Sequence, residues 1–175
     1  MGSKLLKMQP TLVHVPTEKD LVMTPRWLAR DIIAHFQPSG RILDPCRGDG
    51  AFFDQLPEGA DWCEIREGRD FFAYVNQVDW IVSNPPYSCL LSWIRHSFKV
   101  ARNIVYLAPL HRVMASCTFL EDVAAWGGLA EVYVIGTGAT AGFPFGHALA
   151  AVHFQRGYRG GTRWTYCGAI DRICT

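Results

Sequence analysis

The apolar run Asn103–Ala108 constrains the fold of this 175-residue chain more than any other segment. Nearly all of its residues are apolar, which is typical of a strand buried on both faces of a parallel sheet. Before it, Leu91, Ile94 and Phe98 repeat at helical spacing. This spacing predicts an amphipathic helix over 89–101 that covers the sheet. The chain is therefore expected to build a sheet with helices packed against it.

The rest of the chain repeats this alternation of strands and helices. A helix is predicted over 25–36, with Thr24 as its N-cap and Pro25 as its first residue. Further helices are expected to begin at Ala51 and to span 115–126, further strands to span 41–44, 60–65, 78–83, 131–135 and 148–154, and Gly136–Gly146 to form an exposed loop. This order predicts an α/β fold with a single, mainly parallel sheet flanked by helices.

Composition narrows the class of protein. Hydrophobic residues make up 49% of the chain and charged residues 19%, which excludes a disordered chain. No stretch approaches the roughly 18 apolar residues of a membrane span, and the amino terminus lacks a signal-peptide core, so we expect a cytoplasmic protein without membrane contact. Six cysteines and six histidines form no metal-ligand pattern, so reduced thiols and no metal site are expected. Residues 1–175 are predicted to form one domain.

Charge is distributed unevenly along the chain. The net charge is only +1, but residues 1–87 carry a net −3 and residues 88–175 a net +4. The second half can therefore form a positive face, although such an imbalance also arises among ordinary solvated charges.

The first chemical motif is Asp44-Pro45-Cys46-Arg47-Gly48-Asp49-Gly50, which directly follows the predicted strand 41–44. Glycines after a strand let the backbone approach a ligand closely, and a carboxylate such as that of Asp44 accepts hydrogen bonds from an amine or hydroxyl. A plain tight turn would have the same composition. The position at the carboxyl end of a strand, where α/β sheets bind ligands, favours a binding loop.

The second motif is Asn84-Pro85-Pro86-Tyr87, at the end of the predicted strand 78–83. Two successive prolines stiffen the backbone and end the ladder. The Asn84 amide and the Pro85 carbonyl then face the open edge of the sheet, with the Tyr87 ring beside them. Two acceptors and an aromatic plane suit a flat substrate that carries an exocyclic amino group.

Together the two motifs closely resemble those of the amino-directed DNA methyltransferases, which methylate adenine at N6 with S-adenosylmethionine as cofactor. The resemblance covers about residues 20–155 and implies a Rossmann-like methyltransferase fold. It implies that Asn84, Pro85, Pro86 and Tyr87 are catalytic, with Asn84 and the Pro85 carbonyl accepting the two N6 hydrogens and Tyr87 stacking on a base rotated out of the helix. It also implies a set of cofactor-binding residues: Thr24, Pro25, Asp44, Pro45, Gly48, Gly50, Glu64, Asp70 and Asn84.

The polymer that carries the amino group is less constrained than the group itself. Related Asn-Pro-Pro-Tyr motifs occur in enzymes that methylate RNA amino groups or protein glutamine amides, and a non-catalytic partner subunit is a third alternative. The Asp-Pro-Cys start of the glycine loop favours DNA. Only about twenty residues follow Phe154, so no separate target-recognition domain is expected, and sequence specificity is predicted to be low or supplied by a specificity partner or a second copy of the chain.

Several residues of the second half are candidates for DNA contact. The candidates are the basic residues His111, Arg112, Arg156 and Arg159 and the aromatic residues Phe143 and Phe145. Basic side chains hold phosphates without reading bases, and the two phenylalanines are expected to wedge into the gap left by a rotated base.

Overall fold

The computed structural model describes residues 22–168, so the amino-terminal segment 1–21 and the last residues 169–175, with His14 and Cys174, lie outside the described residues. In chain order the helices and strands are α1 Arg26–Phe36, β1 Ile42–Asp44, β2 Asp61–Trp62, β3 Val78–Ser83, α2 Leu90–Val100, β4 Ala101–Pro109, α3 Leu110–Met114, α4 Cys117–Trp126, β5 Gly127–Thr137, β6 Ala148–Arg156 and β7 Arg163–Tyr166. Short 3-10 turns lie at η2 Phe53–Gln55, η3 Ile65–Glu67, η4 Phe71–Ala73 and η5 Tyr87–Cys89.

All seven strands belong to one sheet, in the order β2-β1-β3-β4-β6-β5-β7. The pairs β2-β1, β1-β3, β3-β4 and β5-β7 are parallel, whereas β6 runs antiparallel to both of its neighbours. The predicted α/β class with a mainly parallel sheet is thus confirmed.

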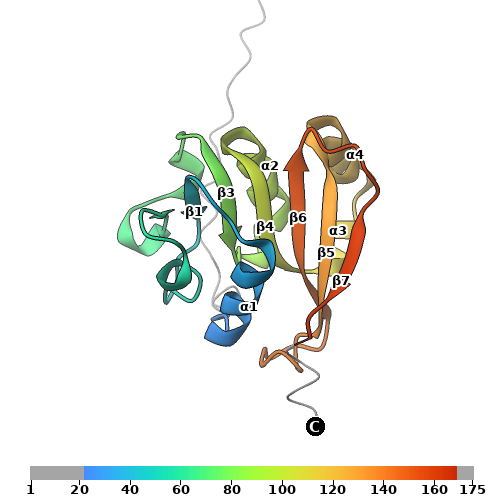
Figure 1. The fold of residues 1–175 in the computed structure, drawn as a ribbon, viewed down its shortest axis with the longest axis horizontal. Helices are drawn as coiled ribbons and strands as arrows, with labels where there is room; N and C mark the ends of the chain where they lie inside the picture. The colour runs from blue at the N-terminus through green and yellow to red at the C-terminus, as the bar shows by residue number, and fades with distance from the viewer. Residues whose placement is uncertain (1–21, 169–175) are drawn as a thin grey trace, which may run out of the picture.

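Helices cover both faces of this sheet (Figure 1), as the apolar run in β4 predicted. Along β4, Ile104 and Tyr106 pack into the core beneath α2 and α4, while Val105 and Leu107 pack into the core beneath α1. This alternation follows from the two-residue period of a strand. The Tyr106 hydroxyl, fully buried, finds its partner in Ser97 Oγ at 2.7 Å. No helix among the described residues is long and apolar enough to cross a membrane.

Three local predictions were wrong. The helix expected from Ala51 is only the single turn η2, because Leu56, which follows the turn, precedes Pro57 and is pushed into extended geometry, with a ψ of 158°. The strand expected over 60–65 is reduced to β2, because Glu64 leaves the ladder and caps η3 with its own carboxylate. Thr24 is not the N-cap of α1: Pro25 occupies that position and no side chain caps the helix.

Two further features of the second half were not predicted. The helix expected over 115–126 is preceded by the separate helix α3, and Ser116 starts α4 by accepting a hydrogen bond from the amide of Phe119. A seventh strand, β7, pairs with the outer side of β5. Its four residues, mostly exposed, carry no alternation that separates them from a loop.

Candidate cofactor and substrate site

Three segments that are far apart in the sequence meet at the carboxyl ends of β1 and β3. Asp44 ends β1, and Ser83 ends β3, which pairs with β1. Ser83 Oγ donates to Asp44 Oδ1 at 2.6 Å, and Asn84 Nδ2 donates to Thr24 Oγ1 at 3.0 Å. The segment before α1, the glycine loop and the Asn-Pro-Pro-Tyr segment are therefore joined by side-chain hydrogen bonds.

Asp44 is fully buried, and one of its two oxygens has no hydrogen-bond partner among the described residues. Oδ1 accepts from Ser83 Oγ and from the amide of Cys46, whereas Oδ2 is buried without a partner. Burial raises the pKa of Asp44 to about 6, against the opposing effect of its hydrogen bonds from Ser83 and the backbone. A buried acceptor that lacks a donor is costly, so Oδ2 is suited to a ligand that brings a donor.

Asn84 has the same combination of a fixed and an unpartnered atom. Its Nδ2 donates to Thr24 Oγ1 and, at 3.4 Å, to the carbonyl of Val22, which can only accept and therefore fixes which end of the amide is nitrogen. Its Oδ1 is buried and has no partner in the described part of the chain. The buried prolines Pro85 and Pro86 follow, so the backbone that carries this amide is stiff.

The glycine loop lies beside these groups and is held by Glu64. The carboxylate of Glu64 accepts from the amide of Gly48 at 3.0 Å and from the amide of Arg66 at 3.2 Å. Among the described residues, a Cβ at Gly48 would have only the Met23 sulfur within 4 Å, at 3.8 Å, so the loop is open on that side. Both glycines have a positive φ, 54° at Gly48 and 84° at Gly50, but a Cβ at Gly50 would meet the Asp54 carboxylate at 2.6 Å. Gly48 therefore faces space and Gly50 serves the turn.

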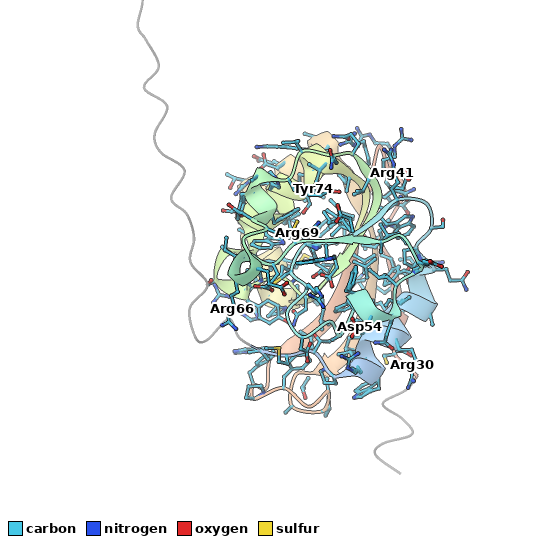
Figure 2. The ribbon with its side chains drawn as sticks, turned by 90° about the vertical axis from the view of Figure 1, so that its left-hand side faces the viewer. Arg30, Arg41, Asp54, Arg66, Arg69 and Tyr74 are labelled. Carbon is cyan, nitrogen blue, oxygen red and sulfur yellow. The ribbon has the colours of Figure 1, made fainter. Side chains whose placement is uncertain are left out.

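Cation-π contacts to Trp62 of β2 lie beside the glycine loop. The guanidinium carbons of Arg47 and Arg69 lie 4.8 Å and 4.0 Å from the ring centroid of Trp62. Arg69 also forms an ion pair with Asp61. Figure 2 looks onto this side of the molecule, where Arg66 and Arg69 are labelled. Arg47 belongs to the glycine loop, so its contact helps to hold the loop against Trp62. A guanidinium on an aromatic face contributes about 0.5–1 kcal/mol at an exposed site.

The other predicted cofactor residues occupy nearby positions. Pro45, at the start of the glycine loop, is buried, and Pro25 is the N-cap of α1, directly after Thr24. Asp70 caps η4 by accepting from the amide of Phe72 at 2.9 Å, which positions the buried ring of Phe71. Its carboxylate is thus engaged in local structure.

Tyr87 follows Pro86 and begins η5. Its hydroxyl is buried without a partner among the described residues, and burial raises its pKa. Its ring is partly exposed and meets Phe145 edge-on, with ring centroids 6.0 Å apart. Phe143 stacks behind Phe145 at 5.3 Å and is only 4% exposed, so in this conformation it supports Phe145 from the core and does not stand out as a wedge.

The basic residues that were predicted to contact DNA lie at opposite ends of the strands. His111 and Arg112 lie on α3, directly after β4, and are exposed at the site edge. Arg156 ends β6, which is antiparallel to β4, so it lies at the opposite edge, where it donates to the carbonyl of Phe98 at 2.6 Å. Arg159 donates to the carbonyls of Ala124 and Gly127 at the end of α4. The structure does not bring Arg156 and Arg159 to the site.

Sequence reasoning missed two polar contributors. Ser83 bridges the two motifs through Asp44, and His147 lies at the site edge, its ring 4.8 Å from that of His111. A small polar residue after the apolar run Trp80–Val82 was the available signal for Ser83. His147 had none, because its neighbourhood depends on the antiparallel return of β6.

Comparison with solved structures identifies the architecture. A putative class I S-adenosylmethionine-dependent methyltransferase from Listeria monocytogenes superposes with a TM-score of 0.63 at 12% identity, over 88% of this chain and 68% of that one. The chain has the methyltransferase fold. A modification subunit of a putative type I restriction enzyme from Vibrio vulnificus matches with a TM-score of 0.56 at 12% identity, over 83% of this chain, and a putative RNA methyltransferase from Pyrococcus horikoshii matches with a TM-score of 0.53 at 11% identity, over 75%.

This methyltransferase fold accounts for only part of some of these relatives. The chain spans 46% of the Vibrio subunit, 68% of the Listeria protein and 80% of the Pyrococcus protein. Searches of the sequence against protein-family models and against curated proteins give no match. At these identities the structures establish the fold, and the chemistry has to be argued from the site.

Proposed function

We propose that this protein transfers a methyl group from S-adenosylmethionine to the N6 amino group of adenine in DNA. The observation that carries the proposal is the Asn84 amide. Its nitrogen is held by Thr24 and Val22, and its oxygen is buried without a partner among the described residues. A fixed acceptor of this kind requires a donor, and an exocyclic amino group supplies one.

The residues on the adjacent strand fit the cofactor. Asp44 Oδ2 is a buried acceptor without a donor, and the loop at Gly48 is open to a ligand. Both Glu64 oxygens already accept a backbone amide, but a carboxylate has about four lone-pair sites, so room remains for ribose hydroxyls. In this proposal Thr24, Asp44, Gly48 and Glu64 hold S-adenosylmethionine, which supplies an electrophilic methyl group.

The chain's own residues then act by position. The lone pair of an adenine amino group is delocalised into the ring, so the group is a poor nucleophile. Asn84 Oδ1 and the Pro85 carbonyl would accept hydrogen bonds from its two N–H groups, which draws the nitrogen towards tetrahedral geometry and aims its lone pair at the methyl group. The bond from N6 to the methyl carbon would form as the sulfur–methyl bond breaks, S-adenosylhomocysteine would leave, and the surplus N6 proton would pass to solvent. Tyr87 would stack on the base, worth about 1–3 kcal/mol. No thiol is needed, and Cys46 has no role as a nucleophile in this scheme.

Kinetics of an Asn84 variant test the proposal. Asn84→Ala should abolish methyl transfer and leave cofactor affinity within about threefold, because the lost hydrogen bond acts mainly in the transition state. Asn76→Ala, an exposed asparagine between η4 and β3, is the matched control and should behave as the wild type. Equal rates for the Asn84 variant and the control would refute the assignment.

The charge pattern favours a nucleic-acid substrate. Between Asp79 and Glu121, which includes the whole Asn-Pro-Pro-Tyr segment, the chain has no acidic residue. A polyanion therefore meets no carboxylate from this part of the chain. The Vibrio protein is named as a modification subunit of a putative type I restriction enzyme, and a DrdV–DNA complex matches with a TM-score of 0.55 at 14% identity. These two names favour DNA, and the Pyrococcus protein, named as a putative RNA methyltransferase, makes RNA the alternative polymer.

A further inference from the structure

A row of aromatic rings leads away from Tyr87 along the carboxyl edge of the sheet. Its members are Tyr87, Phe145, His147 and His111, and we refer to them as the aromatic row. Successive ring centroids are 6.0, 6.2 and 4.8 Å apart. Tyr87 and Phe145 are partly exposed, and His147 and His111 are exposed. The row therefore continues the candidate site outward as an accessible surface.

The loop between β5 and β6 is built to hold this row. The amide of Gly138 donates to the carbonyl of His147 at 2.9 Å, and the amide of Phe143 donates to the carbonyl of Gly138 at 2.8 Å. A Cβ at Gly138 would lie 2.4 Å from the Phe145 ring, so only glycine leaves this ring its place. The positions of Phe145 and His147 thus follow from the backbone of the loop.

The two segments that supply the row carry no negative charge. The segments 80–120 and 132–170, which supply all four rings, contain no aspartate or glutamate, whereas residues 44–79 contain nine. Arg112 lies on α3 next to His111 and is exposed. The segment that supplies the cofactor residues is therefore acidic, whereas the two segments that supply the row contribute no carboxylate and contribute the cation Arg112.

We propose that the aromatic row binds unpaired DNA adjacent to the target adenine, so that the protein acts on single-stranded DNA or on a locally opened duplex. This inference rests on the proposed function. Bases within a duplex strand are stacked about 3.4 Å apart. The rings from Tyr87 to His147 are spaced at 6.0 and 6.2 Å, so bases lying against them are separated from one another.

The chemistry of the row fits such a strand. Aromatic rings bind successive bases of a single strand irrespective of sequence, because every base has a π-face. The imidazoles of His111 and His147 also offer N–H donors to phosphate oxygens, and Arg112 adds a fixed positive charge. In a duplex with one base rotated out of the helix, only that target base would reach Tyr87, and the outer rings of the row would have no base to stack on.

Binding measurements separate this inference from the proposed function. We would measure fluorescence anisotropy of a labelled twelve-nucleotide single strand, its duplex and the RNA strand of the same sequence, each with the full chain. The wild type should bind the DNA single strand at least tenfold more tightly than the duplex and no less tightly than the RNA. His111→Ala/His147→Ala should weaken single-strand binding about tenfold, or about 1.4 kcal/mol. Gly138→Ala, which displaces Phe145, should also weaken it.

The same anisotropy measurements provide the control and the results that would overturn the inference. Arg102→Ala removes an exposed charge at the opposite end of β4 and should leave single-strand affinity unchanged. Calorimetric cofactor affinity and the melting temperature confirm that the variants are folded. Equal affinity for duplex and single strand, a preference for RNA, or an unchanged double histidine variant would each overturn the inference. Tight single-strand binding through the row without any methyl transfer would instead refute the proposed function and leave the row's role in place.

Discussion

Thr24→Val should slow methyl transfer through its effect on Asn84. The substitution preserves the shape of a side chain that is 7% exposed but removes Oγ1, the acceptor that Asn84 Nδ2 reaches at 3.0 Å. The remaining contact, to the carbonyl of Val22, is 3.4 Å long and weak. A lost hydrogen bond of this kind costs about 0.5–1.5 kcal/mol. If that cost falls on the orientation of the amide, the rate should drop about two- to tenfold.

The assay is the single-turnover rate at saturating cofactor and DNA, with Thr24→Ser as the control that retains a hydroxyl. Thr24→Ser should keep a rate close to the wild type. In a double-mutant cycle with Asn84→Ala, the Thr24→Val effect should disappear, because it acts through the amide that is already gone. A Thr24→Val effect of full size in the Asn84→Ala background, or an equally slow Thr24→Ser, would refute this positioning role.

Three further predictions concern single side chains. Tyr87→Phe should keep both activity and stability, because the hydroxyl it removes is buried without a partner among the described residues, whereas Tyr87→Ala should lose most activity; initial rates and thermal melts check both. Glu131→Gln should lower the free energy of unfolding by about 1–3 kcal/mol in urea titrations, because the buried Glu131 carboxylate accepts from His35, Arg163 and Thr165 and glutamine keeps only one acceptor oxygen, while the largely exposed Arg163 returns to water; an unchanged free energy of unfolding would contradict this. Asp44 should make the apo protein less stable as the pH rises from 4 to 6, because its folded pKa of about 6 exceeds its unfolded value of about 4, so the unfolded state loses its proton first; Asp44→Asn should remove this slope in pH-dependent melts.

The sequence predicted the parts of the fold that depend on local pattern. The strand over 78–83 and the helix over 25–36 agree with β3 and α1 to within a residue, because strong apolar periodicity fixed them. The proximity of Asp44 to the end of β3, where Ser83 precedes Asn84, also followed, since neighbouring parallel strands place their carboxyl ends side by side.

What the sequence did not reveal depends on strand direction and on edge pairing. The antiparallel course of β6 puts Arg156 at the edge away from the site and brings His147 to it, and no local pattern encodes that reversal. Thr24 is a residue type that favours the N-cap position, but its hydroxyl accepts a hydrogen bond from Asn84, sixty residues away in the chain. Contacts between residues this far apart in the sequence can override the local structural preference of a residue, as they do at Thr24.

Identification of the methylated product tests the central claim most directly. The full chain would be incubated with isotopically labelled S-adenosylmethionine and with single-stranded DNA, duplex DNA, RNA or protein, and each polymer would then be digested and analysed by mass spectrometry. The account predicts labelled N6-methyladenine from DNA with the wild type and none with Asn84→Ala. Label on an RNA base or a glutamine amide in place of DNA adenine, or DNA product that persists in the Asn84 variant, would contradict it.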